Sequence, residues 1–404
     1  MAADDDILIL GGARTPMAEY AGTPGFGLFK DHSAIELGAI AARAALERTR
    51  VEPRWIEHVI FGNVQQTSAD AIYGARHLAL KAGVPAEVPA VTVNRLCGSG
   101  IEAVIQAAHR LRLGEAQLVL AGGTENMSQA PHVIRGLRAG LRFGQQPALE
   151  DSLFQALYDP MCGLYMAQTA EKLARKYDIS RAAQDAYALR SHRLGVEATD
   201  RGVFRQEIVP VEVETRQGKR PLDFDDHIKR DTSLEKLAAL RPAFGKDGTV
   251  TAGNASGIVD GAAALVLGTR KAQRERDLPV LGRVHAWAVV GVDPSIMGIG
   301  PAPAIRAVLN KAGLRLEQID LFEINEAFAA QYLAVEKELG LERERVNVNG
   351  GAIAIGHPLG ATGARLILTL LMELGRRGGR WGIASACIGG GQGIAILLEN
   401  EAAG

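Results

Sequence analysis

The sequence predicts an α/β fold in which two similar β-α-β halves flank an inserted lobe, and three observations lead to this prediction. Apolar strand-like runs alternate with helical patterns towards both ends of the chain. The segment VTVN at 91–94 is repeated as VNVN at 346–349, and a glycine-rich turn follows each copy. The segment 128–248 between the repeats is richer in charged and turn residues and has no counterpart elsewhere in the chain.

The first repeat continues with a helix pattern and then a strand pattern. Residues 101–113, IEAVIQAAHRLRL, carry apolar side chains at helical spacing, and Gly114 is a suitable helix stop. The run LVLAGG at 118–123 is typical of a buried strand. An earlier run at 51–63, VEPRWIEHVIFGN, predicts a strand that leads to an asparagine.

The second repeat follows the same plan. The run LRLEQIDLFEIN at 314–325 again predicts a strand that ends in an asparagine. The run GARLILTLLMEL at 363–374 predicts a helix that Gly375 or Gly378 ends, and GIASAC at 382–387 predicts the returning strand. We therefore expect parallel or mixed sheets, with the helices of both halves packed between two sheets in a layered αβαβα body.

This pattern divides the chain into three parts. Residues 1–127 and 249–278 are expected to form the first half, and residues 279–404 the second half. Residues 128–248 are expected to form a lobe inserted into the first half. A lobe on a rigid scaffold commonly provides a binding surface, and contact with another subunit is a second candidate role for it.

Composition and charge exclude several classes of protein. The net charge of −1 and the pI of about 6.8 give no electrostatic reason to bind nucleic acid or an anionic membrane. The chain has no run of 18 apolar residues. Residues 1–6 are acidic and lack the basic character of a signal or transit peptide, so a cytoplasmic location is expected. Three cysteines in 404 residues do not indicate a disulfide framework.

The motif VNRLCGSGIEAV at 93–104 places Cys97 between a predicted strand and the N-terminus of a predicted helix. Free backbone N–H groups and the positive end of a helix dipole favour a negative charge there. Such surroundings are expected to lower the pKa of the thiol and to suit a nucleophile that forms a covalent intermediate. Cys162 lacks such a context and is expected to be an ordinary structural cysteine.

Three further motifs end predicted strands or occupy glycine-rich loops. His357 lies in NVNGGAIAIGHPLGATGAR (347–365), among residues too small to pack against it, and is a candidate general base or oxyanion donor. Cys387 ends the last buried strand, and Gly389 follows it with a free N–H for an oxyanion. The amide of Asn325 is expected either to orient a water or His357, or to cap the helix that follows.

At this point the motifs become familiar, because the sequence resembles the thiolase family along essentially its whole length. The matching stretches are GGARTP (11–16), NRLCGSG (94–100), GGTENMSQAPH (122–132), TVTAGNASGIVDGAAA (249–264), NEAFA (325–329), NGGAIAIGHPLGATGAR (349–365) and CIGGGQG (387–393). The resemblance implies the five-layered thiolase fold, a homodimer or homotetramer, and a place in fatty acid metabolism such as β-oxidation. Coenzyme A thioesters are the implied substrates, with no metal and no other cofactor.

The resemblance also implies roles for residues at matching positions. Cys97 resembles the acylated nucleophile, which His357 activates. Cys387 resembles the acid or base that protonates the leaving carbanion in thiolysis, or deprotonates the acetyl-CoA methyl group in condensation. Asn325 with a water, together with His357, resembles one oxyanion hole, and the backbone of Cys97 and Gly389 resembles the other.

Contacts with the substrate are implied in the same way. The expected coenzyme A contacts are Ser256 near the pantetheine amide, Leu157, Met166 and Phe244 along the substrate, and Lys229 and Arg230 at the 3′-phosphate. Short-chain members of the family usually carry a histidine before the methionine of the loop lobe, whereas Tyr165 precedes Met166 here. This difference argues against strict acetoacetyl-CoA specificity and favours broad use of 3-ketoacyl-CoA substrates, with acetyl transfer retained.

Three other classes of protein were weighed. A decarboxylating β-ketoacyl synthase generally has a histidine in place of the second cysteine, so Cys387 argues against that class. A non-catalytic thiolase-like carrier of acyl-CoA or lipid would be signalled by loss of Cys97, His357 or Cys387, and all three are present. A dinucleotide-binding oxidoreductase would need a GxGxxG turn after the first strand, which the sequence lacks.

Overall fold

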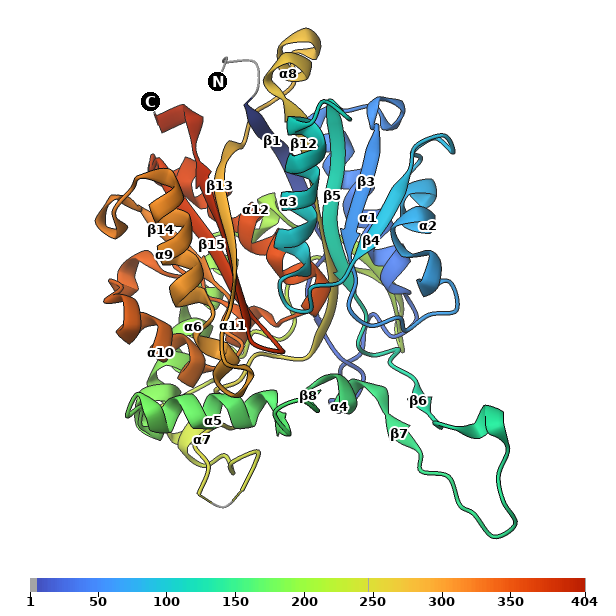
Figure 1. Cartoon of the computed structure of the whole chain (residues 1–404), viewed down its shortest axis with the longest axis vertical. Helices are drawn as coiled ribbons and strands as arrows, with labels where there is room; N and C mark the ends of the chain where they lie inside the picture. The colour runs from blue at the N-terminus through green and yellow to red at the C-terminus, as the bar shows by residue number, and fades with distance from the viewer. Residues whose placement is uncertain (1–5, 246, 404) are drawn as a thin grey trace.

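Each half of the chain forms a sheet with helices on both faces, in a computed structural model that describes residues 6–245 and 247–403 (Figure 1). The first half contains β1 (Ile7–Arg14), β2 (Ala18–Glu19), α1 (Ala34–Thr49), β3 (His58–Gly62), α2 (Gly74–Lys81), β4 (Ala90–Val93), α3 (Ser99–Arg112), β5 (Leu118–Glu125), β12 (Val259–Thr269) and α8 (Arg270–Arg276). The second half contains β13 (Gly282–Gly291), α9 (Pro301–Ala312), β14 (Leu321–Ile324), α10 (Ala329–Leu339), α11 (Ala352–Ile355), α12 (Leu359–Arg377), β15 (Trp381–Ile388) and β16 (Gln392–Glu399).

The order of the strands confirms the predicted duplication. The first half runs β4-β3-β5-β12-β1 across its sheet, and the second half runs β14-β15-β16-β13, so that β3, β5, β12 and β1 correspond to β14, β15, β16 and β13. The second copy of the repeat, at 346–349, does not form a strand like the first copy. It contributes a single isolated bridge, between Val346 and Phe322. Asn347 has a left-handed φ of 48°, which a continuing strand cannot accommodate.

The two sheets are joined rather than separate. Strands β1 and β13, which correspond to each other, pair in an antiparallel direction through Leu8 with Arg283 and Ile9 with Gly282. This short seam connects the two expected sheets and makes one continuous strand order from β4 to β14. Both halves mix parallel pairs, such as β3–β5 and β14–β15, with antiparallel ones.

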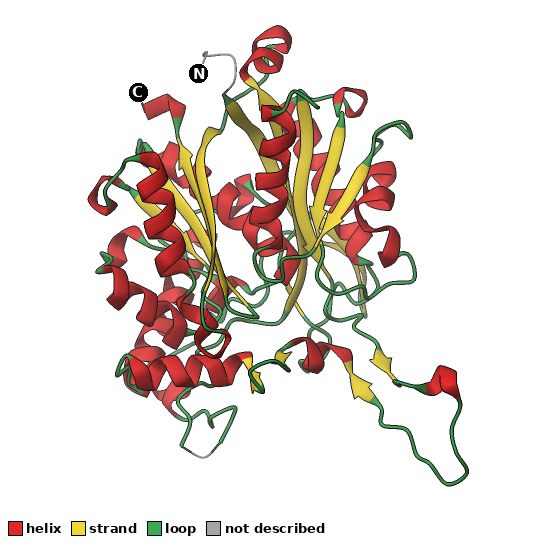
Figure 2. Cartoon of the chain, viewed as in Figure 1, coloured by secondary structure: helices red, strands yellow, loops and turns green. Residues whose placement is uncertain are grey.

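The five-layered arrangement is confirmed by the buried side chains. Helices α3 and α12 pack against each other and against the inner faces of both sheets, as the contacts of Ile101, Leu366, Val119 and Ile396 illustrate. Helices α1 and α2 cover the outer face of the first sheet, and α9 and α10 cover the outer face of the second. Figure 2 shows the two central helices between the yellow sheets.

The residues between β5 and β12 lie at the end of the sheets where β5 leaves the body (Figure 1). They form β6 (His132–Val133), β7 (Glu150–Asp151), α4 (Ser152–Ala156), β8 (Tyr158–Asp159), β9 (Leu164–Tyr165), α5 (Met166–Lys176), α6 (Arg181–Asp200), the hairpin of β10 (Val211–Thr215) and β11 (Gly218–Leu222), and α7 (Leu234–Ala238). The chain beyond β6 projects from the body as a long arm and returns through β7 (Figure 2).

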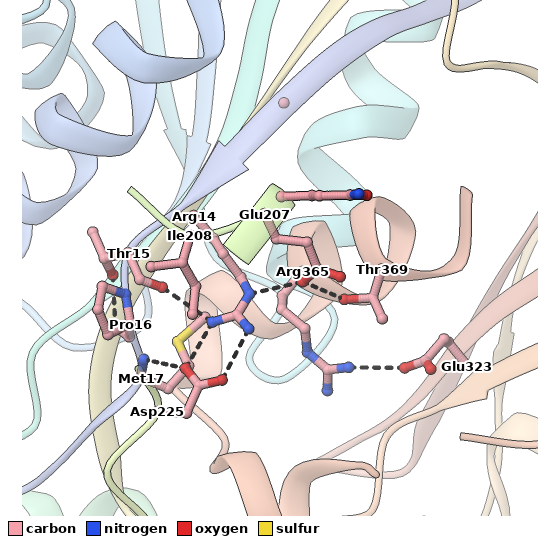
Figure 3. A network of polar contacts seen from close by, with 12 residues as sticks. Arg14, Thr15, Pro16, Met17, Glu207, Ile208, Asp225, Glu323, Arg365 and Thr369 are labelled. Atoms are coloured by element: carbon pink, nitrogen blue, oxygen red, sulfur yellow. Dashed lines mark hydrogen bonds and ion pairs between the residues drawn. The ribbon is translucent and has the colours of Figure 1, made fainter. Parts of the chain in front are cut away.

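A buried ionic network holds the inserted residues to the body (Figure 3). The guanidinium of Arg14, at the end of β1, donates to Glu207 at 2.9 Å and to both oxygens of Asp225 at 2.7 and 2.9 Å. Glu207 also accepts a hydrogen bond from Thr369 of the central helix α12 at 3.0 Å. Removing one partner from such a network leaves an unpaired buried charge, so these contacts fix the lobe strongly against both halves.

Candidate active site

Cys97 and His357 occupy corresponding places in the two halves. Cys97 lies just before Ser99, the first residue of α3, and His357 lies just before Leu359, the first residue of α12. The first turns of these two helices touch, because an added Cβ at Gly100 would lie 2.5 Å from the backbone nitrogen of Ala364. Only glycine permits this approach, and the approach brings the two helix starts together at the centre of the molecule.

A strained turn presents Cys97. Leu96, the preceding residue, has a left-handed φ of 46°, which is unfavourable for a branched side chain. The hydroxyl of Ser99 accepts from the N–H of Arg95 at 2.9 Å and donates to the carbonyl of Leu96 at 2.7 Å, so it closes the turn from within. This geometry was not predicted. The serine two residues after the cysteine is the sequence signal that could have indicated it.

Cys387 and Gly389 lie beside Cys97. Gly389 lies beside the sulfur of Cys97, and its backbone N–H favours a negative charge on that sulfur. An added Cβ at Gly98 would lie 2.6 Å from Ile388, so the cysteine turn rests directly on the end of β15. Cys387 is completely buried near the end of that strand and close enough to Cys97 for their charges to interact. The structure thus brings the two predicted sulfurs together.

His357 is held by partners on both ring nitrogens. Nε2 lies 3.3 Å from the amide nitrogen of Asn325, and Nδ1 lies 2.6 Å from the hydroxyl of Thr362. Helix α10 begins at Ala329 with Phe328 as its N-cap residue, so Asn325 does not cap that helix. Of the two interpretations of Asn325 from the sequence, contact with His357 is the one that the structure contains.

The cysteine pair and the histidine group share neighbours. Cys97 and Ile258 pack against the same buried cluster, which includes Leu359. The backbone N–H of His357 donates to the carbonyl of Gly257, next to Ile258, at 2.9 Å. Ala327, which follows Asn325 closely, packs against Cys387. The five predicted reacting residues therefore surround one site at the start of the two central helices.

The pKa values of this site contradict one prediction. Burial raises the pKa of the Cys97 thiol to about 11, although the N–H of Gly389 acts in the opposite direction. The expected lowering by the helix start was wrong, because loss of hydration outweighs the dipole. Burial, with the charge of Arg365, lowers the pKa of His357 to about 3, and burial also raises the pKa of Cys387. At neutral pH all three groups are uncharged.

This electrostatic state predicts the pH dependence of Cys97 alkylation. Only the thiolate reacts with iodoacetamide, and its fraction increases about tenfold per pH unit at any pH below the pKa. With a pKa of about 11, the alkylation rate of the free enzyme should keep rising between about pH 6 and pH 9. Peptide mapping of the label at Cys97 measures this rate. A rate that levels off near neutral pH would instead indicate a stabilised thiolate.

Four of the six predicted substrate contacts line one cavity of about 390 Å³. Leu157, Met166, Phe244 and Ser256 all face it. The cavity lies next to the cysteine pair, because Met166, which lines it, has its sulfur 3.3 Å from the position of a Cβ added at Gly389. Its other lining residues are mostly apolar and aromatic, as expected for a small-molecule site.

Tyr165 is the centre of an aromatic group on this cavity. Its ring lies 4.5 Å from that of Phe154, 4.9 Å from that of Tyr158 and 5.2 Å from that of Phe244, between ring centroids. Such packing fixes the ring in place and makes this wall of the cavity rigid and apolar. The sequence pointed to Tyr165 only through its difference from short-chain relatives, and the aromatic group itself was not predicted.

Lys229 and Arg230 are not among the residues that line this cavity. The ammonium of Lys229 lies 2.6 Å from Glu19 and over the ring of Phe26, and Arg230 pairs with Asp200 at 2.7 Å. Glu19 itself lines the cavity, as does His227, which lies 2.9 Å from the same carboxylate. Sequence reasoning missed Glu19 and His227, which are far apart along the chain and carry no motif of their own.

Comparisons with known proteins agree with this geometry. The model of the thiolase N-terminal domain matches residues 7–271, and that of the thiolase C-terminal domain matches residues 278–400. The chain belongs to the thiolase family. Human mitochondrial 3-ketoacyl-CoA thiolase is 49% identical over the full length of both chains, and the acetyl-CoA acetyltransferase of Pseudomonas aeruginosa is 46% identical over 98% of this chain and all of that one.

Solved thiolase structures confirm the fold. The crystal structure of the human mitochondrial enzyme superposes with a TM-score of 0.96, covering 99% of this chain and all of that one at 49% identity. The same enzyme in complex with CoA gives a TM-score of 0.95 at 48% identity. This thiolase is therefore an acyltransferase of the same fold.

Within residues 6–245 and 247–403, His, Cys, Asp and Glu side chains form no group of three or more suited to hold a metal ion. Over the same ranges, no helix is both long and apolar enough to cross a bilayer.

Proposed function

We propose that this thiolase catalyses the reversible thiolysis of 3-ketoacyl-CoA and the reverse condensation with acetyl-CoA, through an acyl group on Cys97. The observation that carries the proposal is the placement of Cys97 beside Cys387 and Gly389, where the turn of Cys97 packs on the end of β15. A thiol nucleophile next to an imidazole and a second thiol can transfer an acyl group and a proton at one site.

In thiolysis the first step forms the acyl enzyme. The sulfur of Cys97 attacks the 3-keto carbon while Nε2 of His357 takes the thiol proton. The bond between C2 and C3 then breaks, and the enolate of acetyl-CoA takes the proton of Cys387, leaving a thiolate. A raised pKa suits Cys387 to this role, because the group rests in the protonated form that the step requires.

The second step restores the enzyme. An incoming CoA thiol gives its proton to the Cys387 thiolate, and its sulfur attacks the acyl carbon on Cys97. The sulfur of Cys97 leaves and recovers its proton from His357, so every group returns to its starting state. The backbone N–H groups of Cys97 and Gly389 are proposed to stabilise the oxyanions of both tetrahedral intermediates.

The enolate oxygen is proposed to face His357 and a water held by Asn325. The amide oxygen of Asn325 is buried and has no hydrogen-bond partner among the described residues. Buried amide oxygens are rarely left without a partner, and a bound water commonly supplies one. His357 is positively charged after it has taken the proton of Cys97, so it is a strong hydrogen-bond donor to the enolate oxygen.

The cavity lined by Leu157, Met166, Phe244 and Ser256 is proposed to hold the substrate, and the inserted residues 128–248 are proposed to act as the coenzyme A-binding lobe of the first half. The crystal structure of the human relative with CoA supports this assignment of ligand. Lys229 and Arg230 stay candidates for the 3′-phosphate, although each already has a carboxylate partner. A cytoplasmic location and a role in β-oxidation also stay predictions.

The chain-length range of the thiolase provides the test of the proposed function. Burying one further methylene group contributes about 0.8 kcal/mol, so kcat/KM for thiolysis should rise about fourfold per added carbon beyond acetoacetyl-CoA until the cavity is filled. A coupled assay over 3-ketoacyl-CoA substrates of increasing length measures this. Activity confined to acetoacetyl-CoA would refute the interpretation of Tyr165, and no thiolysis of any substrate would refute the proposed function.

We also propose that the enzyme is a homodimer or homotetramer. Strand β4 is the open edge of the first sheet, and Val91 on it is exposed beside Ile72 and Tyr73. An exposed apolar edge strand is suited to pair with another chain. The projecting arm adds exposed apolar side chains at Leu137, Leu141, Phe143 and Leu149. Light scattering of the purified enzyme tests this, and a monomeric mass would contradict it.

A further inference from the structure

The hydroxyl of Thr362 makes the closest contact to the ring of His357. Thr362 belongs to the first turns of α12 and is only 1% exposed. Its oxygen lies 2.6 Å from Nδ1 of His357 and 3.1 Å from the carbonyl oxygen of Pro358. One side chain thus bridges the imidazole and the backbone at the start of the helix.

The contacts of Thr362 and Asn325 together favour one arrangement of protons on the imidazole. A hydroxyl has one proton to donate, and here it is directed to the carbonyl of Pro358, which can only accept and also receives the N–H groups of Ala361 and Thr362. In this arrangement the oxygen of Thr362 accepts from Nδ1, which carries the ring proton. The lone pair of Nε2 then faces the amide N–H of Asn325 at 3.3 Å. Both contacts agree on a single tautomer.

We propose that Thr362 is a positioning residue that holds His357 in the Nδ1–H tautomer, so that Nε2 is the nitrogen that takes the proton of Cys97. The proposal rests on the proposed function, in which His357 acts as the base. The opposite tautomer would present an N–H to the thiol and could not accept its proton. A neutral resting imidazole, which the lowered pKa of His357 indicates, is required for this choice between tautomers to matter.

Thr362 also contributes to the transfer of the proton from Cys97 to His357. When Nε2 takes the proton of Cys97, the ring becomes an imidazolium with N–H groups on both nitrogens, and the proton on Nδ1 stays on the threonine oxygen. The charge therefore forms on a ring whose second N–H already has an acceptor. When the proton returns from Nε2 to the departing sulfur of Cys97, the original tautomer is restored without rotation of the ring.

The test compares Thr362→Val with Thr362→Ser. Valine has nearly the same shape but neither donates nor accepts, whereas serine keeps the hydroxyl. We expect Thr362→Val to lower the rate of Cys97 acylation by acetyl-CoA about 10- to 100-fold, the loss typical when the orienting partner of a functional histidine is removed. The KM for acetyl-CoA should change less than about twofold, since no substrate contact is lost. Thr362→Ser should stay within about threefold of the wild type.

A matched control lies on the same helix. Thr369 is also fully buried, and its hydroxyl donates to Glu207 at 3.0 Å, away from His357 (Figure 3). Thr369→Val removes a buried hydrogen bond of similar kind, so it should lower thermal stability as Thr362→Val does while keeping the acylation rate of the wild type. Melting temperatures of both variants show whether each is folded at the assay temperature.

Two outcomes would overturn the proposal. Equal acylation rates for Thr362→Val and the wild type would show that the hydroxyl does not orient the ring. An equal loss in Thr362→Val and Thr369→Val would assign the effect to stability. Failure of the proposed function itself is distinguishable, because the wild-type enzyme would then carry no acyl group on Cys97 at all.

Discussion

Replacing Cys97 with alanine should abolish the acyl enzyme and reduce thiolysis by at least about four orders of magnitude, as removal of a nucleophile commonly does. The alanine variant keeps the cavity and the imidazole but has no sulfur to attack the thioester. Mass spectrometry after incubation with acetyl-CoA should show one acetyl group on the wild-type peptide that contains Cys97 and none on the variant. Because the replaced side chain is small, the fold should be retained.

Cys162→Ala is the matched control for this experiment. Cys162 is the remaining cysteine outside the site, partly exposed in the inserted lobe, and its sulfur makes a long contact of 4.0 Å to the carbonyl of Asp159. The variant should acylate and turn over like the wild type. An acetyl group found on Cys162 or on Cys387 in the Cys97→Ala protein, with activity retained, would remove Cys97 from the mechanism.

Cys387→Ala should separate the two halves of the reaction. Acylation of Cys97 by acetyl-CoA uses His357 for its proton transfer, so the variant should still form the acyl enzyme at a rate similar to that of the wild type. Thiolysis of 3-ketoacyl-CoA needs an acid for the enolate, and its loss should lower the rate by about 10²- to 10⁴-fold. The measurements are the acetyl mass on Cys97 and the steady-state thiolysis rate of the same preparation.

Two other results for Cys387→Ala would change the role assigned to Cys387. If thiolysis stays at the wild-type rate, the proton of the enolate comes from another group and the role given to Cys387 is wrong. If acylation is lost as well, Cys387 supports the position of Cys97, against which the end of its strand packs, and the effect is structural.

Most of the fold could be predicted because periodicity and repetition agreed. The apolar patterns at 101–113 and 118–123 each fit only one kind of element, a helix and a buried strand. The observed α3 and β5 have nearly the same bounds. Gly378, one of two predicted stops, is the left-handed cap of α12. The hairpin of β10 and β11 was missed, since Pro221 and charged residues obscure the alternation of Val211 and Val213.

The site was predicted less completely than the fold. Motifs at strand ends were enough to name Cys97, His357, Cys387, Asn325 and Gly389, because strand ends meet at one edge of an α/β sheet. The protonation of the thiols was not predictable from motifs, since it depends on how completely distant parts of the chain exclude water. The contact of Thr362 with His357 also required coordinates, because a threonine in a helix start has many possible partners.

The seam between β1 and β13 joins halves that cannot work alone. Cys97, the proposed nucleophile, belongs to the first half. The proposed partners His357, Cys387, Asn325 and Gly389 all belong to the second half. Neither half contains a complete set of reacting groups, so natural selection for catalysis acts on the fit between them. A change in the relative rotation of the halves would separate the reactants even if each half remained perfectly folded.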